Sequence, residues 1–110
     1  MSWTALNQLT QLNQLDELSK EKACIIFKHS TRCSISHLVL SRFERENDIK
    51  DKTFFFLDLI SFRDLSNAIA ERYQLKHESP QLLVIKNGQC VAHASHHSIH
   101  QIVLTDFSNE

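Results

Sequence analysis

The sequence predicts a layered α/β fold with a mixed β-sheet, formed as one domain over residues 1–110. Two apolar runs that are too short for buried helices alternate along the chain with longer segments of helical periodicity. An Asn87-Gly88 dipeptide stands between two further apolar runs, and a two-residue turn joins only antiparallel strands. Because the other strands alternate with helices, a sheet that includes this hairpin is mixed.

Three strands are expected before the hairpin. Residues 23–27 and 53–57 are continuous apolar runs, which are typical of strands covered on both faces. Leucine recurs at every third position from 6 to 18, and such a stripe drifts about 60° per step around a helix. One straight helix does not fit this drift, so we predict a short edge strand at residues 3–6 and a helix at residues 10–20.

The hairpin is predicted at residues 82–85 and 89–93. Asn-Gly supplies the positive φ values that a type I′ turn requires. A two-residue loop then sets the cross-strand pairs, which we expect to be Lys86 with Gln89, Ile85 with Cys90 and Leu82 with His93.

Three more helices are predicted at residues 34–47, 62–73 and 98–107, because apolar side chains recur there at helical spacing. Ser61 is a candidate N-cap of the second, and Ser98 or His97 of the third. The expected inward stripes are Ile35, Leu38, Val39, Phe43 and Glu46, then Phe62, Leu65, Ile69 and Tyr73, then Ile99, Ile102, Val103 and Phe107.

Composition excludes several classes of protein. Lys plus Arg is 12 and Asp plus Glu is 13, which gives no basic field for a nucleic acid or an anionic membrane. The single glycine excludes a dinucleotide fingerprint and a P-loop. No apolar run approaches the roughly 20 residues that span a bilayer, and the first positive side chain is Lys20, unlike a signal peptide. We therefore expect a cytoplasmic protein whose three cysteines are thiols.

Cys33 is the candidate nucleophile. It follows a predicted strand and precedes a predicted helix, the place where ligands bind in open α/β sheets. The free N–H groups of a helix N-terminus favour a thiolate, and Arg32 and His29 add nearby positive charge. The alternative is that Cys33 is a small core residue, as free cysteines often are.

The chain resembles the monothiol bacilliredoxin family, the thioredoxin-like proteins of the bacillithiol system in low-GC Gram-positive bacteria. The matching stretches are residues 27–36 (FKHSTRCSIS), residues 76–81 (KHESPQ), the Asn87-Gly88 hairpin and residues 93–96 (HASH). The resemblance implies a thioredoxin-like three-layer α/β fold. Its mixed five-stranded sheet would have four central strands and a short N-terminal edge strand, flanked by helices.

The resemblance also implies an activity. The chain would be a monothiol thiol-disulfide oxidoreductase that removes bacillithiol from client proteins and forms an adduct on Cys33. Bacillithiol would be a co-substrate, with no tightly bound cofactor. Expected partners are S-bacillithiolated clients and bacillithiol, with no nucleic acid and no membrane, and a monomer is expected.

Further site residues follow from the resemblance. Ser79-Pro80 would be a cis-proline turn beside Cys33. Bacillithiol carries two carboxylates on its malate part, so cations are expected near the thiol. The candidates are Lys28, Arg32, Lys76 and His77. Lys28 and Lys76 fit equally well as ordinary solvated charges. The residues expected to stabilise the thiolate or bind substrate are Arg32, Ser36, Thr31, His29, Ser79, Pro80 and His77.

Ser36 stands where a dithiol redoxin has its second cysteine. Its hydroxyl either donates a hydrogen bond to the Cys33 thiolate or only occupies the first helical turn. Cys24 lies at the opposite end of the strand that leads to Cys33, about 16 Å from the strand's last residue. If Pro80 is near Cys33, the strand that follows Pro80 carries the chain about 18 Å away before it reaches Cys90. A disulfide needs Cα atoms within about 7 Å, so both are expected to be core residues.

Two other functions remain open from the sequence. One is a thioredoxin-like redox sensor or interaction module that is S-thiolated at Cys33, and the other is an iron–sulfur carrier of monothiol-glutaredoxin type, although Ser34 stands where those proteins usually have glycine. A metal site is not expected, because no cysteine or carboxylate clusters with the histidines at 93, 96, 97 and 100. Phosphatase loops with Cys-x5-Arg are unsupported, because residue 39 is Val.

Overall fold

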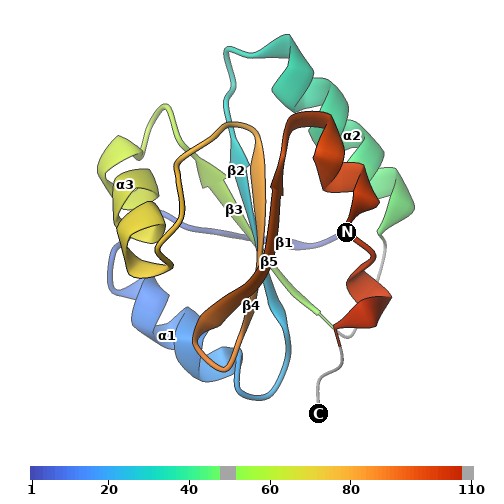
Figure 1. Ribbon diagram of the computed structural model, residues 1–110. Helices are drawn as coiled ribbons and strands as arrows, with labels where there is room; N and C mark the ends of the chain where they lie inside the picture. The colour runs from blue at the N-terminus through green and yellow to red at the C-terminus, as the bar shows by residue number, and fades with distance from the viewer. Residues whose placement is uncertain (48–51, 108–110) are drawn as a thin grey trace.

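A computed structural model describes residues 1–47 and 52–107, and within them it contains one five-stranded mixed sheet (Figure 1). The strand order is β1-β3-β2-β4-β5, in which β1, β2 and β3 run parallel and β4 is antiparallel to both β2 and β5. The strands are β1 (Trp3–Ala5), β2 (Cys24–His29), β3 (Thr53–Asp58), β4 (Gln81–Lys86) and β5 (Gln89–Ser95). The α/β fold with a mixed five-stranded sheet is confirmed.

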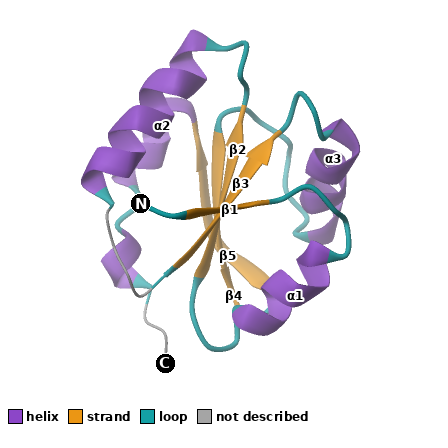
Figure 2. Cartoon of the chain, turned by 180° about the vertical axis from the view of Figure 1, so that it is seen from behind, coloured by secondary structure: helices purple, strands orange, loops and turns teal. Residues whose placement is uncertain are grey.

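Helices cover both faces of the sheet, which makes three layers (Figures 1 and 2). Helices α1 (Gln11–Leu18) and α3 (Arg63–Arg72) cover one face. Helix α2 (Ser34–Glu46) covers the other, together with the 3₁₀ segments η1 (His96–Gln101) and η2 (Leu104–Asp106). None of the helices within the described ranges is long and apolar enough to cross a membrane.

The continuous apolar run of β2 is explained by this layering. All six residues of β2 are buried, and alternate side chains enter opposite core clusters. Ile26 packs under α1 and α3, whereas Ile25 and Phe27 pack under α2. The strand extends two residues beyond the predicted end, to His29, which brings the chain directly to the turn before Cys33.

The N-terminal prediction is confirmed. β1 pairs in parallel with β3 and with no other strand of the described chain, so it is an edge strand, and a separate helix, α1, follows it. Trp3 anchors β1, because its ring packs against those of Phe27, Phe43, Phe54 and Phe56 at centroid distances of 5.6–6.1 Å.

The hairpin has the predicted turn but a different register. Asn87 and Gly88 both have positive φ, and Lys86 faces Gln89 and Ile85 faces Cys90 as expected. A bulge between Val84 and Ile85 then shifts the pairing by one residue. Leu82 therefore faces Ala94 rather than His93, because β5 has one more residue than the ladder accommodates.

The predicted helix at residues 98–107 is wrong. The chain forms two short 3₁₀ segments instead, and Ser95 rather than Ser98 or His97 takes the N-cap position. Ile102 and Val103 separate the two segments in extended conformations, which suit β-branched residues. Only Ile99 and Leu104 of this region are fully buried, so the segment follows the core without completing a helix.

Two further details of the helices differ from expectation. The buried face of α2 is formed by Ser36, Val39 and Phe43, whereas the predicted stripe residues Ile35 and Leu38 are 40% and 66% exposed. Phe62, not Ser61, occupies the N-cap position of α3. The Ser61 hydroxyl instead donates to Asp58 Oδ2 at 3.0 Å and closes the turn after β3.

Candidate active site

Cys33 lies at the junction between β2 and α2. Residues 30–33 form a turn in which the Cys33 N–H donates to the Ser30 carbonyl at 3.2 Å. Cys33 is the N-cap of α2 with extended φ and ψ of −112° and 118°, and its side chain is partly exposed. The thiol therefore stands at the positive end of a 13-residue helix whose first turn holds no acidic residue.

Ser36 is fully buried one turn into α2, and its hydroxyl faces the end of β2. Ser36 Oγ accepts a hydrogen bond from the Ser30 N–H at 3.1 Å and lies 2.7 Å from His29 Nδ1. The hydroxyl is thus held by the strand and the turn. Both contacts of the hydroxyl in the structure are thus with the end of β2 and the turn that follows it.

His29, expected to add positive charge near Cys33, is buried at the end of β2. Its side chain is 3% exposed on the α2 face of the sheet. Burial lowers the pKa of His29, and His37, whose ring centroid lies 4.6 Å away, lowers it further, against weaker opposing effects of Asp58 and Glu44. The surroundings of His29 therefore disfavour its charged form.

His37 is a site residue that the sequence reasoning missed. Its Nε2 donates to the Thr31 carbonyl at 3.0 Å, and its ring meets that of His29 edge to face. Its spacing of four residues from Cys33, one helical turn, was the available signal. His37 and Ser36 together tie both sides of the active-site turn to α2, while the Thr31 and Arg32 side chains remain exposed.

The Ser79-Pro80 peptide bond is cis, and Pro80 is buried. Gln81 pairs with Lys28 at the end of the antiparallel ladder, so the residues before β4 and the residues after β2 leave the sheet at the same end. The Pro80 carbonyl accepts the N–H of His96 at 3.0 Å. The buried Ser79 hydroxyl has no hydrogen-bond partner among the described residues. The cis-proline turn and the Cys33 turn thus lie at the same end of the sheet, and the cis-proline turn holds a buried polar atom without a partner among the described residues.

Lys28 and His77 are brought together, but away from the Cys33 side of the sheet. Lys28 is fully buried beneath α3, where its Nζ donates to the Ser66 carbonyl at 3.1 Å and lies 3.4 Å from His77 Nδ1. Burial lowers the pKa of Lys28 to about 8. The pKa of His77 is also lowered, first by burial and then by Lys28. Strand alternation explains the placement, because Lys28 and His29 point to opposite faces.

The remaining candidate cations near the thiol are exposed. Arg32 directly precedes Cys33, and its side chain is open to solvent. Lys76 is exposed as well, and its carbonyl accepts a hydrogen bond from Gln81 Nε2 at 3.0 Å. Of the expected cations, Arg32 is the one adjacent to the nucleophile in the chain.

Cys24 and Cys90 lie toward the other end of β2 and the hairpin. Cys24 is the first residue of β2 and faces Ile85, which in turn faces Cys90. Burial raises the pKa of Cys24 to about 12 and also raises the pKa of Cys90. All three cysteines are free thiols.

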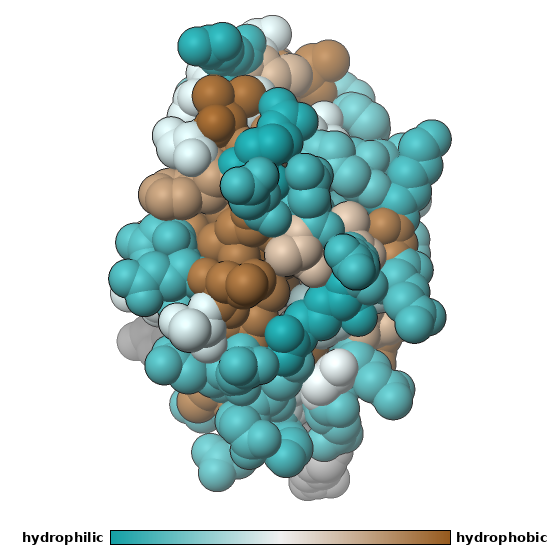
Figure 3. Space-filling model, turned by 90° about the vertical axis from the view of Figure 1, so that its left-hand side faces the viewer, coloured by the Kyte–Doolittle hydropathy of each residue, from teal (hydrophilic) through white to brown (hydrophobic). Residues whose placement is uncertain are grey.

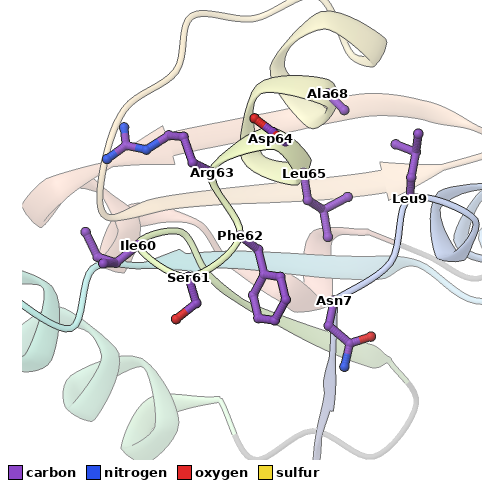
Figure 4. A pocket seen from close by; sticks show the side chains of 9 residues that line it. All are labelled: Asn7, Leu9, Ile60, Ser61, Phe62, Arg63, Asp64, Leu65 and Ala68. Atoms are coloured by element: carbon purple, nitrogen blue, oxygen red, sulfur yellow. The ribbon is translucent and has the colours of Figure 1, made fainter.

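A cavity of about 430 Å³ opens at the carboxyl ends of β1 and β3 (Figure 4). Figure 3 shows apolar side chains among polar ones on the side of the molecule that carries α1 and α3. Leu9 and Phe62, 61% and 38% exposed, contribute to the cavity lining. The cavity lies at the same end of the sheet as the Cys33 turn. The parallel strands β2 and β3 both end there, and the Leu59 N–H after β3 donates to the His29 carbonyl at the end of β2 at 3.0 Å.

No group of three or more His, Cys, Asp or Glu side chains within residues 1–47 and 52–107 is arranged to hold a metal ion.

Comparisons with known proteins agree with this geometry. The family model described as monothiol bacilliredoxin BrxC matches residues 4–104. A solved structure described as a candidate oxidoreductase with a thioredoxin fold is 31% identical, with a TM-score of 0.74 over 88% of this chain and 85% of its own.

Two thioredoxins illustrate the fold alone. Schistosoma mansoni thioredoxin is 23% identical, with a TM-score of 0.75 over 97% of this chain and 96% of its own. Malassezia sympodialis thioredoxin is 21% identical, with a TM-score of 0.74 over 96% of this chain and 90% of its own.

Proposed function

The chain belongs to the monothiol bacilliredoxin family and is a thiol-disulfide oxidoreductase of thioredoxin fold, and from this premise we propose that it removes bacillithiol from mixed disulfides with client proteins. Cys33 is the attacking group in this proposal. The observation that carries it is the position of a partly exposed thiol at the N-terminus of α2, with a hydroxyl rather than a second thiol three residues later.

The reaction needs two exchanges. The Cys33 thiolate attacks the bacillithiol sulfur of the mixed disulfide, the client thiolate leaves, and a Cys33–bacillithiol disulfide forms. A second low-molecular-weight thiolate then attacks the bacillithiol sulfur, expels the Cys33 thiolate and leaves a disulfide of two small thiols. One disulfide is consumed and one is formed in each step, so no external oxidant is required.

The helix end supports the first exchange. Free N–H groups in the first turn of α2 favour the negative thiolate, both before attack and when it leaves again. The exposed Arg32 side chain adds a cation beside it and is available to a carboxylate of the bacillithiol malate part. Thr31, in the same turn, is also exposed, and its side chain is our second candidate for contact with the adduct.

The cis-proline turn supports binding of the client. A buried hydroxyl without a partner costs about 1–3 kcal/mol, and that of Ser79 lies next to Pro80, just before β4 and at the same end of the sheet as the Cys33 turn. A client segment that meets this turn satisfies the hydroxyl only when the turn opens, because the oxygen is inaccessible in the free protein. His77, which hydrogen-bonds with the buried polar groups under α3, is not assigned a contact with substrate.

The test is release of bacillithiol from a modified protein, followed by intact-mass spectrometry. The wild-type protein is expected to regenerate the client thiol and to gain one bacillithiol, whereas Cys33→Ser is expected to do neither, because a hydroxyl is a poor nucleophile at neutral pH. Cys90→Ala is the matched control and should retain release. Release by Cys33→Ser would refute the proposal, and cluster absorbance in place of release would favour an iron–sulfur carrier.

A further inference from the structure

A second cavity, of about 250 Å³, lies between α2 and η1. Figure 1 shows η1 beside α2 on their common face of the sheet. Its apolar floor includes the buried side chains Val39, Phe43 and Ile99. Its remaining lining consists of exposed Leu38 and four basic residues, Arg42, Arg45, His97 and His100. No described residue that lines it carries a carboxylate, so the cavity combines an apolar floor with a basic rim.

Helix α2 connects this cavity to the nucleophile. Leu38, Arg42 and Arg45 are spaced by four and three residues, which sets them on one face of the helix. Ile35 is 40% exposed and lies between Leu38 and Cys33 along the helix. At 1.5 Å per residue, Arg42 is about 13 Å along the helix from Cys33. The exposed surface is therefore apolar near the thiol and basic farther from it.

The charged residues at the rim of the cavity indicate which kind of peptide would bind there. Arg42 Nε pairs with Glu46 Oε1 at 3.1 Å, but both side chains are about half exposed, so the pair contributes little stability and is open to exchange. Arg45 adds a second guanidinium on the same rim. A basic rim attracts carboxylates and repels cations, while the floor takes an apolar side chain. This combination fits a peptide segment that has both acidic and apolar residues.

Resting on the proposed release of bacillithiol, we propose that this cavity is a docking site for the client protein and takes an acidic and apolar segment next to the modified cysteine. An extended chain advances about 3.3 Å per residue, so the 13 Å from Cys33 to Arg42 corresponds to about four residues. Asp or Glu about four residues from the modified cysteine would meet Arg42 and Arg45, and an apolar residue nearer to it would meet Leu38. The site thus discriminates among clients by sequence.

The test compares two bacillithiolated peptides that are identical except for a Glu-Glu or a Gln-Gln pair about four residues from the cysteine. The wild-type protein is expected to have about fivefold higher kcat/KM for the acidic peptide, because the free energies of two exposed ion pairs add. The ratio should approach one in Arg42→Gln/Arg45→Gln and in high salt. Lys20→Gln removes an exposed cation from the other face and should keep the wild-type ratio. A ratio of one in the wild-type protein would overturn the docking site.

A binding measurement separates this inference from the proposed function. The acidic peptide, without bacillithiol, is titrated into Cys33→Ser protein and followed by NMR of the backbone amides. We expect shifts confined to residues 38–45 and 97–100, and weaker binding of the Gln-Gln peptide. If the wild-type protein releases bacillithiol from neither peptide, the proposed function fails. The titration still shows whether the cavity binds the acidic peptide. Equal binding of both peptides, or shifts elsewhere, would overturn the docking site.

Discussion

Ser36 Oγ lies 2.7 Å from His29 Nδ1 and 3.1 Å from the backbone nitrogen of Ser30, so one buried hydroxyl joins the last residue of β2 to the turn that carries Cys33. The position that holds a resolving thiol in dithiol redoxins thus has a structural role here. His37 holds the opposite side of the same turn through the Thr31 carbonyl. The geometry of the nucleophile depends on these two contacts of α2.

Ser36→Ala should lower the free energy of unfolding by about 1–3 kcal/mol, because it leaves the Ser30 N–H and a buried ring nitrogen without their partner. Urea denaturation measures the loss. Ser34→Ala is the matched control: Ser34 is exposed in the same helical turn, and its substitution should change stability far less. Equal stability of the two variants would mean that the Ser36 contacts contribute nothing.

Stability should fall as the pH drops below about 6.5, the ordinary pKa of histidine. The folded state lowers the pKa of His29 and of His77, chiefly through burial, so the unfolded chain binds more protons than the folded one in this range. The free energy of unfolding therefore decreases with falling pH.

Urea denaturation at pH 7 and pH 5 checks this expectation. His29→Gln should lose less stability between the two pH values than the wild-type protein, because one of the two groups no longer titrates. His100→Gln, on exposed η1, should show the wild-type loss. A His29→Gln variant as acid-sensitive as the wild-type protein would remove His29 as a cause.

Lys28 should make the free energy of unfolding rise with pH above neutrality. Its pKa is lowered to about 8 in the folded state by burial, against about 10.4 in an unfolded chain. Between these values the unfolded chain holds the proton and the folded chain does not, so stability rises with pH. From pH 8 to 9.5 the gain is about 1.6 kcal/mol relative to Lys28→Met, which has no titrating group. A difference between the two proteins that is constant with pH would contradict this.

The layers and the site turn could be predicted because their signals are local. The apolar run of β2, the Asn87-Gly88 turn and Cys33 between a strand and a helix each determine nearby structure. The misjudged features depend on contacts between distant segments. Ile99 and Leu104 enter the core from 3₁₀ segments, and no local pattern shows that Ile102 and Val103 would be extended. The burial of Lys28 depends on Ser66 and His77, which are 38 and 49 residues away.

Cys33 should react with alkylating reagents well before the other two thiols. Burial raises the pKa of Cys24 to about 12, and Cys90 is shifted in the same direction, so little thiolate exists at either position near pH 8. Peptide mapping after brief iodoacetamide treatment of native protein measures the order, and treatment in urea is the control that should label all three. Early labelling of Cys24 would contradict its buried place at the start of β2.

Ser36→Cys should convert the single exchange into an internally resolved one. In the wild-type protein without added thiol, the reaction is expected to stop after one equivalent, with bacillithiol on Cys33. A thiol introduced at position 36 lies one helical turn from Cys33, and it can attack the Cys33 sulfur and expel bacillithiol as a thiolate. Intact mass should show that the adduct disappears and that a disulfide remains within the protein.

Ser34→Cys is the matched control for this conversion. It places a thiol in the same turn of α2, but adjacent residues form a disulfide only with strain, so the adduct should persist. If the Ser36→Cys variant also keeps its adduct, then the inward orientation of side chain 36 toward His29 prevents attack, and the position is not equivalent to that of a resolving cysteine. Loss of the adduct in both variants would instead indicate that any thiol in the first turn of α2 resolves it, and the orientation of Ser36 would then be irrelevant to the mechanism.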